Sequence, residues 1–157
     1  MDVDDLLAHC TLCPRRCGVN RRAGARGFCG AGREVRVART MLHRWEEPCL
    51  VGAHGAGAVF FAHCTLRCIY CQNHAISHEG SGTEMRTEEL AARFLTLQRE
   101  GAATLDLVTP THYTPQILTA LTLARAEGLT LPVVWNTSGY ETVENIARLA
   151  GAVGIYL

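Results

Sequence analysis

The sequence predicts an α/β protein built around a parallel sheet. From Ala58 onward, short apolar segments alternate with longer amphipathic ones in the order β-α-β-α-β-α-β. Turns that contain glycine or proline end these segments, and 48% hydrophobic with 19% charged residues is typical of a single globular domain. Strands that alternate with helices of this length form parallel sheets through right-handed crossovers.

The first third of the chain lacks this regularity. Residues 10–32 are rich in Gly, Arg and Cys and show no apolar period, which predicts an irregular segment. Alternation over Glu34–Thr40 indicates a short strand, and the compact apolar run Ala58–Ala62 indicates a buried one. We therefore expect a Cys- and Arg-rich extension over residues 1–50, followed by the regular domain over residues 51–157.

The regular part is predicted element by element. Apolar residues at helical spacing indicate a helix over 87–100, ended by Gly101. The later elements are expected as a strand over 103–108, a helix from Thr114 to about 124, a strand over 131–135, a helix over 141–150 and a strand over 153–157. Asp106 is either a buried, hydrogen-bonded carboxylate or a sign that its strand is shorter. Because no helix follows the last strand, a truncated domain is expected.

The net charge and the length of the apolar runs argue against a nucleic-acid-binding or a membrane protein. The 15 basic residues, all of them arginine, balance 15 acidic ones, so no overall field attracts nucleic acid or an anionic membrane. Eight arginines lie between Arg15 and Arg39, with Phe28 the one aromatic residue among them, so we expect them to offset thiolate charge or cover the domain. The longest apolar run is too short to span a bilayer, and the acidic start is not a signal peptide. The expected location is the cytoplasm, without a membrane or nucleic-acid partner.

The eight cysteines form two groups and one single residue. Cys49 stands alone, and we expect it to be a half-buried free thiol. In a reducing compartment, closely spaced cysteines are typical of metal sites. The two groups are C-x2-C-x3-C-x11-C, formed by Cys10, Cys13, Cys17 and Cys29, and C-x3-C-x2-C, formed by Cys64, Cys68 and Cys71.

The second group is expected at the carboxyl edge of the sheet. It follows the strand ending at Ala62, and the polar loops 108–112 and 136–139 follow two further strands, so three loops converge on one site. Three cysteines leave one metal position open, whereas four would close the site. A zinc loop completed by His63 or His74 is the alternative for this group.

The segment CTLRCIYC at residues 64–71 resembles the signature of the radical S-adenosylmethionine (SAM) enzymes. Over the whole chain, the sequence is more closely similar to the pyruvate formate-lyase activating enzyme homologues of that superfamily, through CTLCPRRCGVNRRAGARGFCGAG, CTLRCIYCQNHAISH, LVTPTHYTPQI and VVWNTSGYE. The resemblance implies a partial (β/α) TIM-type barrel, truncated at its C-terminus. It also implies an iron–sulfur enzyme that reductively cleaves SAM to a 5′-deoxyadenosyl radical for hydrogen abstraction.

The same resemblance assigns roles to residues of this chain. Cys64, Cys68 and Cys71 match the ligands of a [4Fe-4S] cluster, and the positions matching SAM contacts are Tyr70, Gln72, Thr109, Asn136, Thr137 and Ser138. The loop at residues 108–112 reads Val-Thr-Pro-Thr-His where the family usually has a Gly-Gly-Glu-like stretch, so the contact to the SAM amino group stays unassigned. No catalytic residue is assigned.

Several expectations stay open at this level. The N-terminal Cys10, Cys13, Cys17 and Cys29 fit a structural zinc, a second iron–sulfur cluster or four reduced thiols. The expected partners are an electron donor such as flavodoxin or ferredoxin and a protein substrate carrying a glycyl residue. The alternative function is a non-catalytic zinc or iron–sulfur module that binds RNA or a protein partner.

Overall fold

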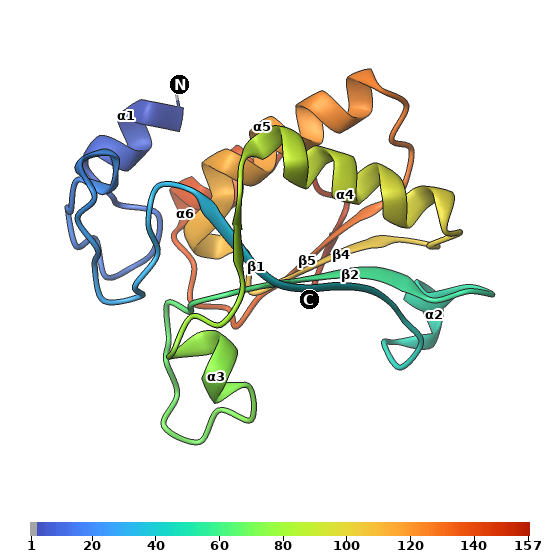
Figure 1. Cartoon of the computed structure of the whole chain (residues 1–157), viewed down its shortest axis with the longest axis horizontal. Helices are drawn as coiled ribbons and strands as arrows, with labels where there is room; N and C mark the ends of the chain where they lie inside the picture. Colours follow the sequence, from blue (N-terminus) through green and yellow to red (C-terminus); the bar gives the residue numbers. More distant parts are fainter. Residues whose placement is uncertain (1–2) are drawn as a thin grey trace.

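The computed structural model describes residues 3–157, with side chains from Asp5 onward. It is a two-layer arrangement in which the long helices lie on one face of a six-stranded sheet (Figure 1). None of the helices within residues 3–157 has the length and apolar character needed to cross a membrane. The parallel α/β prediction is confirmed for the second half of the chain, and the sheet is open rather than closed into a barrel.

The strand order in the sheet is β3-β1-β2-β4-β5-β6. The four strands β2, β4, β5 and β6 are parallel, whereas β1 runs antiparallel to both β2 and β3. Because β1 pairs with β2, part of the N-terminal extension belongs to the same sheet as the regular domain. The strand bounds are β1 Val35–His43, β2 Ala56–Phe61, β3 Thr83–Met85, β4 Leu105–Val108, β5 Val133–Asn136 and β6 Ile155–Tyr156.

The three longer predicted helices are present, and the structure adds short ones. The predicted helix at 141–150 is shorter, because the Thr142 side chain accepts a hydrogen bond from the backbone N–H of Asn145 and starts the helix there. Elements of three to six residues are too short for a hydrophobic period. The helical segments are α1 Val3–Ala8, η1 Arg21–Ala23, α2 Pro48–Val51, α3 His74–Ser77, α4 Thr87–Arg99, η2 Thr111–Tyr113, α5 Thr114–Ala126 and α6 Val143–Arg148.

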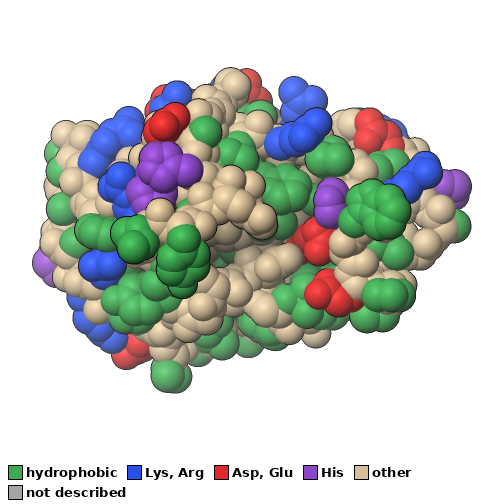
Figure 2. All heavy atoms as spheres, turned by 90° about the horizontal axis from the view of Figure 1, so that it is seen from below, with side chains coloured by type: hydrophobic (Ala, Val, Ile, Leu, Met, Phe, Trp, Pro, Cys, Tyr) green, Lys and Arg blue, Asp and Glu red, His purple; other side chains and the backbone are tan. Residues whose placement is uncertain are grey.

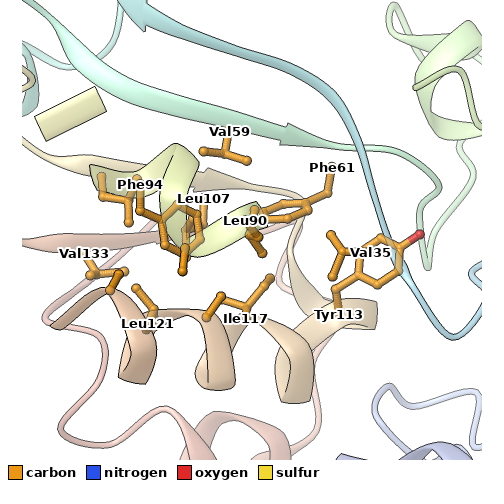
Figure 3. Close-up of a cluster of buried hydrophobic side chains, with 14 of the residues drawn as sticks. Val35, Val59, Phe61, Leu90, Phe94, Leu107, Tyr113, Ile117, Leu121 and Val133 are labelled. Atoms are coloured by element: carbon orange, nitrogen blue, oxygen red, sulfur yellow. The ribbon is translucent and has the colours of Figure 1, made fainter. Parts of the chain in front are cut away.

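The hydrophobic core lies between the sheet and the helices α4 and α5 (Figure 3). Side chains alternate along a strand, so every second residue of β2 and β4 points into this layer. Val59 and Leu107 from the sheet and Phe94 and Ile117 from the helices are all fully buried there. Burial of side chains of this size stabilises the fold by about 1.5–3 kcal/mol each.

The opposite face of the sheet carries Ala58, Asp106 and Val134 side by side on neighbouring strands. The helices α4 and α5 do not cover this face, and Figure 2 shows it with hydrophobic, histidine and acidic side chains around a shallow hollow. Asp106 is fully buried, and its oxygens have no hydrogen-bond partner in the described part of the chain. Asp106 lies within β4, so the strand assignment there is correct and the carboxyl is buried, as one of the two expectations had it. Burial raises the pKa of Asp106 to about 7, Glu46 adds to the rise, and Asn136 opposes it.

We predict that Asp106→Asn makes the protein more stable at neutral and higher pH than wild type, but not at pH 4. The ordinary pKa of the carboxyl is 3.8, so between pH 4 and 7 the folded protein keeps a proton that the unfolded chain has lost. The free energy of unfolding of wild type then falls with rising pH, by about 4 kcal/mol at most, and is level above pH 7. Urea unfolding of both proteins from pH 4 to 8 measures this difference, because the other carboxyls titrate alike in both. A difference that does not change with pH would contradict the prediction.

Candidate functional site

The carboxyl ends of β2, β4 and β5 meet at one edge of the sheet, and hydrogen bonds join the loops that follow them. The His112 Nε2 atom lies 2.8 Å from the Ala62 carbonyl oxygen, which links the β4 loop to the end of β2. The backbone N–H of Thr109 donates to the Asn136 carbonyl oxygen at 2.8 Å, which links the β4 and β5 loops. The expected convergence of the three loops is thus present in the structure.

The loop after β2 carries the three cysteines of the second group. Cys64, Cys68 and Cys71 are half-buried free thiols, and the Cys71 N–H donates to the Cys68 carbonyl at 3.1 Å. Arg67 has a φ of +52°, a left-handed conformation that turns the chain sharply between the first two cysteines. The buried Ser77 hydroxyl donates to the Cys71 sulfur at 3.3 Å. One short loop therefore presents three sulfur atoms near the sheet edge.

The donor set of this loop fits an iron–sulfur cluster. Thiolates are the protein ligands of such clusters, and hydrogen bonds to their sulfurs tune them, a role that the Ser77 hydroxyl would have at Cys71. Three thiols leave one iron free to bind a small molecule. Across residues 3–157, no three cysteine, histidine or acidic side chains stand together in an arrangement that would hold a metal ion. The fit accordingly rests on the type and spacing of the donors.

The residues expected to contact SAM occupy two kinds of position. Thr109, Asn136 and Thr137 are half-buried on the joined β4 and β5 loops, and Thr109 has a strained φ of +57°. Ser138 is exposed on the β5 loop. On the cysteine loop, the Tyr70 side chain is 86% exposed, and Gln72 is exposed as well.

His63, directly before Cys64, fixes the start of the cysteine loop. Its backbone has a φ of +71°, and its N–H donates to the Ile76 carbonyl at 2.9 Å. The ring lies so close to Gly30 and Gly80 that a Cβ at Gly30 would be 2.9 Å from its Nδ1 atom. Burial, together with the nearby Arg26, lowers the pKa of His63 to about 4, so the ring is neutral at physiological pH. Both ring nitrogens lack a hydrogen-bond partner within the described residues.

The second histidine considered for a zinc loop lies elsewhere. His74 is exposed at the start of α3, where its ring stacks on His78 with the centroids 4.3 Å apart. Its Nδ1 atom is 3.5 Å from the Glu79 carboxylate. In the structure the His74 ring is thus paired with His78 and Glu79.

The N-terminal cysteines are held in an irregular segment by backbone hydrogen bonds. The N–H of Cys10 donates to the Val19 carbonyl, and the Cys10 carbonyl accepts from Gly18. Burial raises the pKa of the Cys13 thiol, and the neighbouring Cys10 and Cys17 raise it further. Burial also raises the pKa of Cys29, with smaller contributions from Cys10 and Cys13. The four thiols therefore lie close enough to influence one another electrostatically.

Arginines of the N-terminal segment hold it against the site through hydrogen bonds to backbone carbonyls. The fully buried Arg21 donates to the Gly32 and His112 carbonyls at 2.6 Å each. Arg15 donates to the Thr65 carbonyl at 3.0 Å, and its guanidinium carbon lies 3.4 Å from the centre of the Phe28 ring. The N-terminal segment is thereby tied to both the β4 loop and the cysteine loop.

Two site features differ from the sequence expectation. Cys49 is exposed and not half-buried, because it lies in the short helix α2 within the β1–β2 connection.

Glu141, expected from the sequence only as a helix start, is the centre of a hydrogen-bond network. Its carboxylate accepts from the Thr137 hydroxyl at 2.9 Å and the Trp135 Nε1 at 3.2 Å, and also from Thr111 and Asn145. The sequence gives no indication of this role except the closeness of Glu141 to the polar β5 loop.

Comparison with known proteins agrees with this geometry. The family model described as the radical SAM superfamily matches residues 58–157. The chain is 31% identical over 160 residues to "Uncharacterized protein MJ0674" of Methanocaldococcus jannaschii, an alignment that covers 98% of this chain and 45% of that protein. No solved structure matches. The family match supports an enzyme over a non-catalytic binding module, and the family implies a [4Fe-4S] cluster and SAM. The chain belongs to the radical SAM superfamily.

Proposed function

We propose that Cys64, Cys68 and Cys71 hold a [4Fe-4S] cluster whose open iron binds SAM. The observation that carries this proposal is the presence of three free thiols on one loop at the sheet edge, inside the region that matches the family. When bound and reduced, such a cluster would supply the electron for the cleavage of SAM, and the chemistry so provided would be abstraction of a hydrogen atom from the substrate.

The chain's own residues would bind and orient SAM beside the cysteine loop. The Thr111 and Thr137 hydroxyls lie 3.5 Å apart on the β4 and β5 loops, and both are held by the Glu141 carboxylate. A hydroxyl fixed by such a network keeps its remaining hydrogen-bonding capacity for a ligand. Asn136 adds a half-buried amide at the same edge. We assign SAM orientation to these two loops.

The finer function that we propose is that of an activating enzyme. Its substrate would be a glycyl residue of a partner protein, and its reductant a flavodoxin or ferredoxin. The support is the similarity of the quoted segments to pyruvate formate-lyase activating enzyme homologues. All eight cysteines are free thiols, which supports a reducing compartment such as the cytoplasm.

We predict that the anaerobically reconstituted, dithionite-reduced protein gives a four-iron electron paramagnetic resonance signal that shifts when SAM is added. In Cys68→Ala this signal should be lost, because two thiols cannot hold the cluster. Cys49→Ala is the matched control, since Cys49 is an exposed thiol outside both groups. An iron signal that SAM leaves unchanged in wild type would rule out the proposed function.

We also propose that Cys10, Cys13, Cys17 and Cys29 together bind a metal, either zinc or a second cluster. Their mutual electrostatic influence and the burial of Cys10 and Cys13 support this, because buried neighbouring thiols are stabilised when a metal binds them as thiolates.

We predict that Cys13→Ser lowers the metal content of the purified protein and leaves the SAM-dependent shift intact. Elemental analysis for zinc and iron measures the content, with Cys49→Ser as control. An unchanged metal content in Cys13→Ser would contradict this second site.

The Glu141 network gives a prediction about SAM affinity. We expect Glu141→Gln to raise about tenfold the SAM concentration that produces half of the spectral shift, because two loop hydroxyls lose a charged acceptor. The cluster signal without SAM should stay the same. Glu144→Gln in the following helix α6 is the control, since its carboxylate is exposed and pairs with Arg16. Equal SAM affinity in both variants would show that Glu141 does not orient the loops for SAM.

A further inference from the structure

A β-bulge in β1 changes which side chains face the open side of the sheet. Val35 and Val37 point into the core below the helices, and Val37 is paired with Phe61. The next pairing is Arg39 with Phe60, so Ala38 is an extra residue with no partner in the register. Strict alternation would have put residue 39 in the core as well. The bulge instead turns residues 39, 41 and 43 to the open face. Bulges commonly redirect side chains in this way.

These re-aimed side chains form one wall of a hollow. Its other wall comes from α3, the short helix that follows the cysteine loop, and its floor from β2. The lining residues are Arg39, Met41, His43, Phe60, Asn73 and Ile76. The α3 wall is fixed to the cysteine loop, because the Ile76 carbonyl accepts the hydrogen bond from His63 that precedes Cys64. The hollow therefore opens beside the proposed cluster.

The hollow combines apolar surface with an uncompensated positive charge. Met41, Phe60 and Ile76 are apolar, and Phe60 meets the His43 ring edge-on with the centroids 6.2 Å apart. The His43 Nδ1 atom lies 3.0 Å from the Glu46 carboxylate, so that carboxylate is paired with His43 and not with Arg39. Arg39 is exposed and forms no ion pair or hydrogen bond within residues 3–157. A guanidinium has five donors in a planar fork suited to a carboxylate.

We propose that this hollow binds an organic carboxylate with an apolar body. The carboxylate would lie on Arg39 in a two-point contact, and the apolar part would cover Met41, Phe60 and Ile76. The proposal that a carboxylate binds here rests only on the residues that line the hollow. That the occupant is the substrate from which the hydrogen atom is taken rests on the proposed function, and the position beside α3 would bring it near SAM.

Three probes of one shape and different charge test the proposal: 3-phenylpropionate, 3-phenylpropan-1-ol and 3-phenylpropylammonium. We expect titration calorimetry to show that the wild-type protein binds the acid about tenfold more tightly than the alcohol and the amine. Arg39→Gln should reduce the affinity for the acid about tenfold, to that for the alcohol. Arg93→Gln is the matched control, since Arg93 is an exposed arginine of α4 on the helix side of the sheet.

Three results would overturn the proposal. They are equal affinity for acid and alcohol, an Arg39→Gln protein that binds the acid as wild type does, and competition between the acid and SAM, which would make the hollow part of the cofactor site. The spectral shift with SAM reports on the proposed function separately, and Arg39→Gln should leave it unchanged. If SAM causes no shift while the acid still binds through Arg39, the proposed function fails and the binding site stands.

Discussion

The parallel pairing of β2 with β4 and of β4 with β5 positions everything at the candidate site. In this register Phe60, Val108 and Asn136 lie side by side at the ends of their strands. The chain leaves all three strands at the same edge. The pairing of the strands is therefore enough to make the cysteine loop and the two polar loops neighbours. His112 and Glu141 then fix the loops to one another. A register shift of one residue would separate these groups and turn their side chains to the other face.

The N-terminal segment is joined to this edge by guanidinium groups rather than by a hydrophobic core. Arg21 reaches two backbone carbonyls from a fully buried position, and Arg15 bridges the Phe28 ring and the cysteine loop. Buried carbonyls without partners are costly, so an arginine that serves two of them stabilises an irregular segment efficiently. The cysteines of this segment consequently lie next to the site and not on a separate module.

Much of this arrangement could be predicted from sequence, for identifiable reasons. The helix α4 has a clear apolar period, the strands β4 and β5 are compact apolar runs, and the spacing of Cys64, Cys68 and Cys71 is local. Features that depend on distant contacts could not be predicted. The bulge at Ala38 depends on pairing with β2, and the role of Glu141 depends on hydroxyls up to 30 residues away. The short elements α3 and β3 carry too few residues for any period.

The tight fit of His63 between Gly30 and Gly80 has a consequence for how the two cysteine groups relate. Gly30 follows Cys29 directly, and His63 precedes Cys64 directly. The contact between the His63 ring and the Gly30 backbone therefore joins the chain next to one cysteine group to the chain next to the other. Any side chain at either glycine would push the ring away. The backbone at Gly30 and the start of the cysteine loop at His63 are therefore in direct steric contact, so neither glycine position can take a side chain without a shift of the ring.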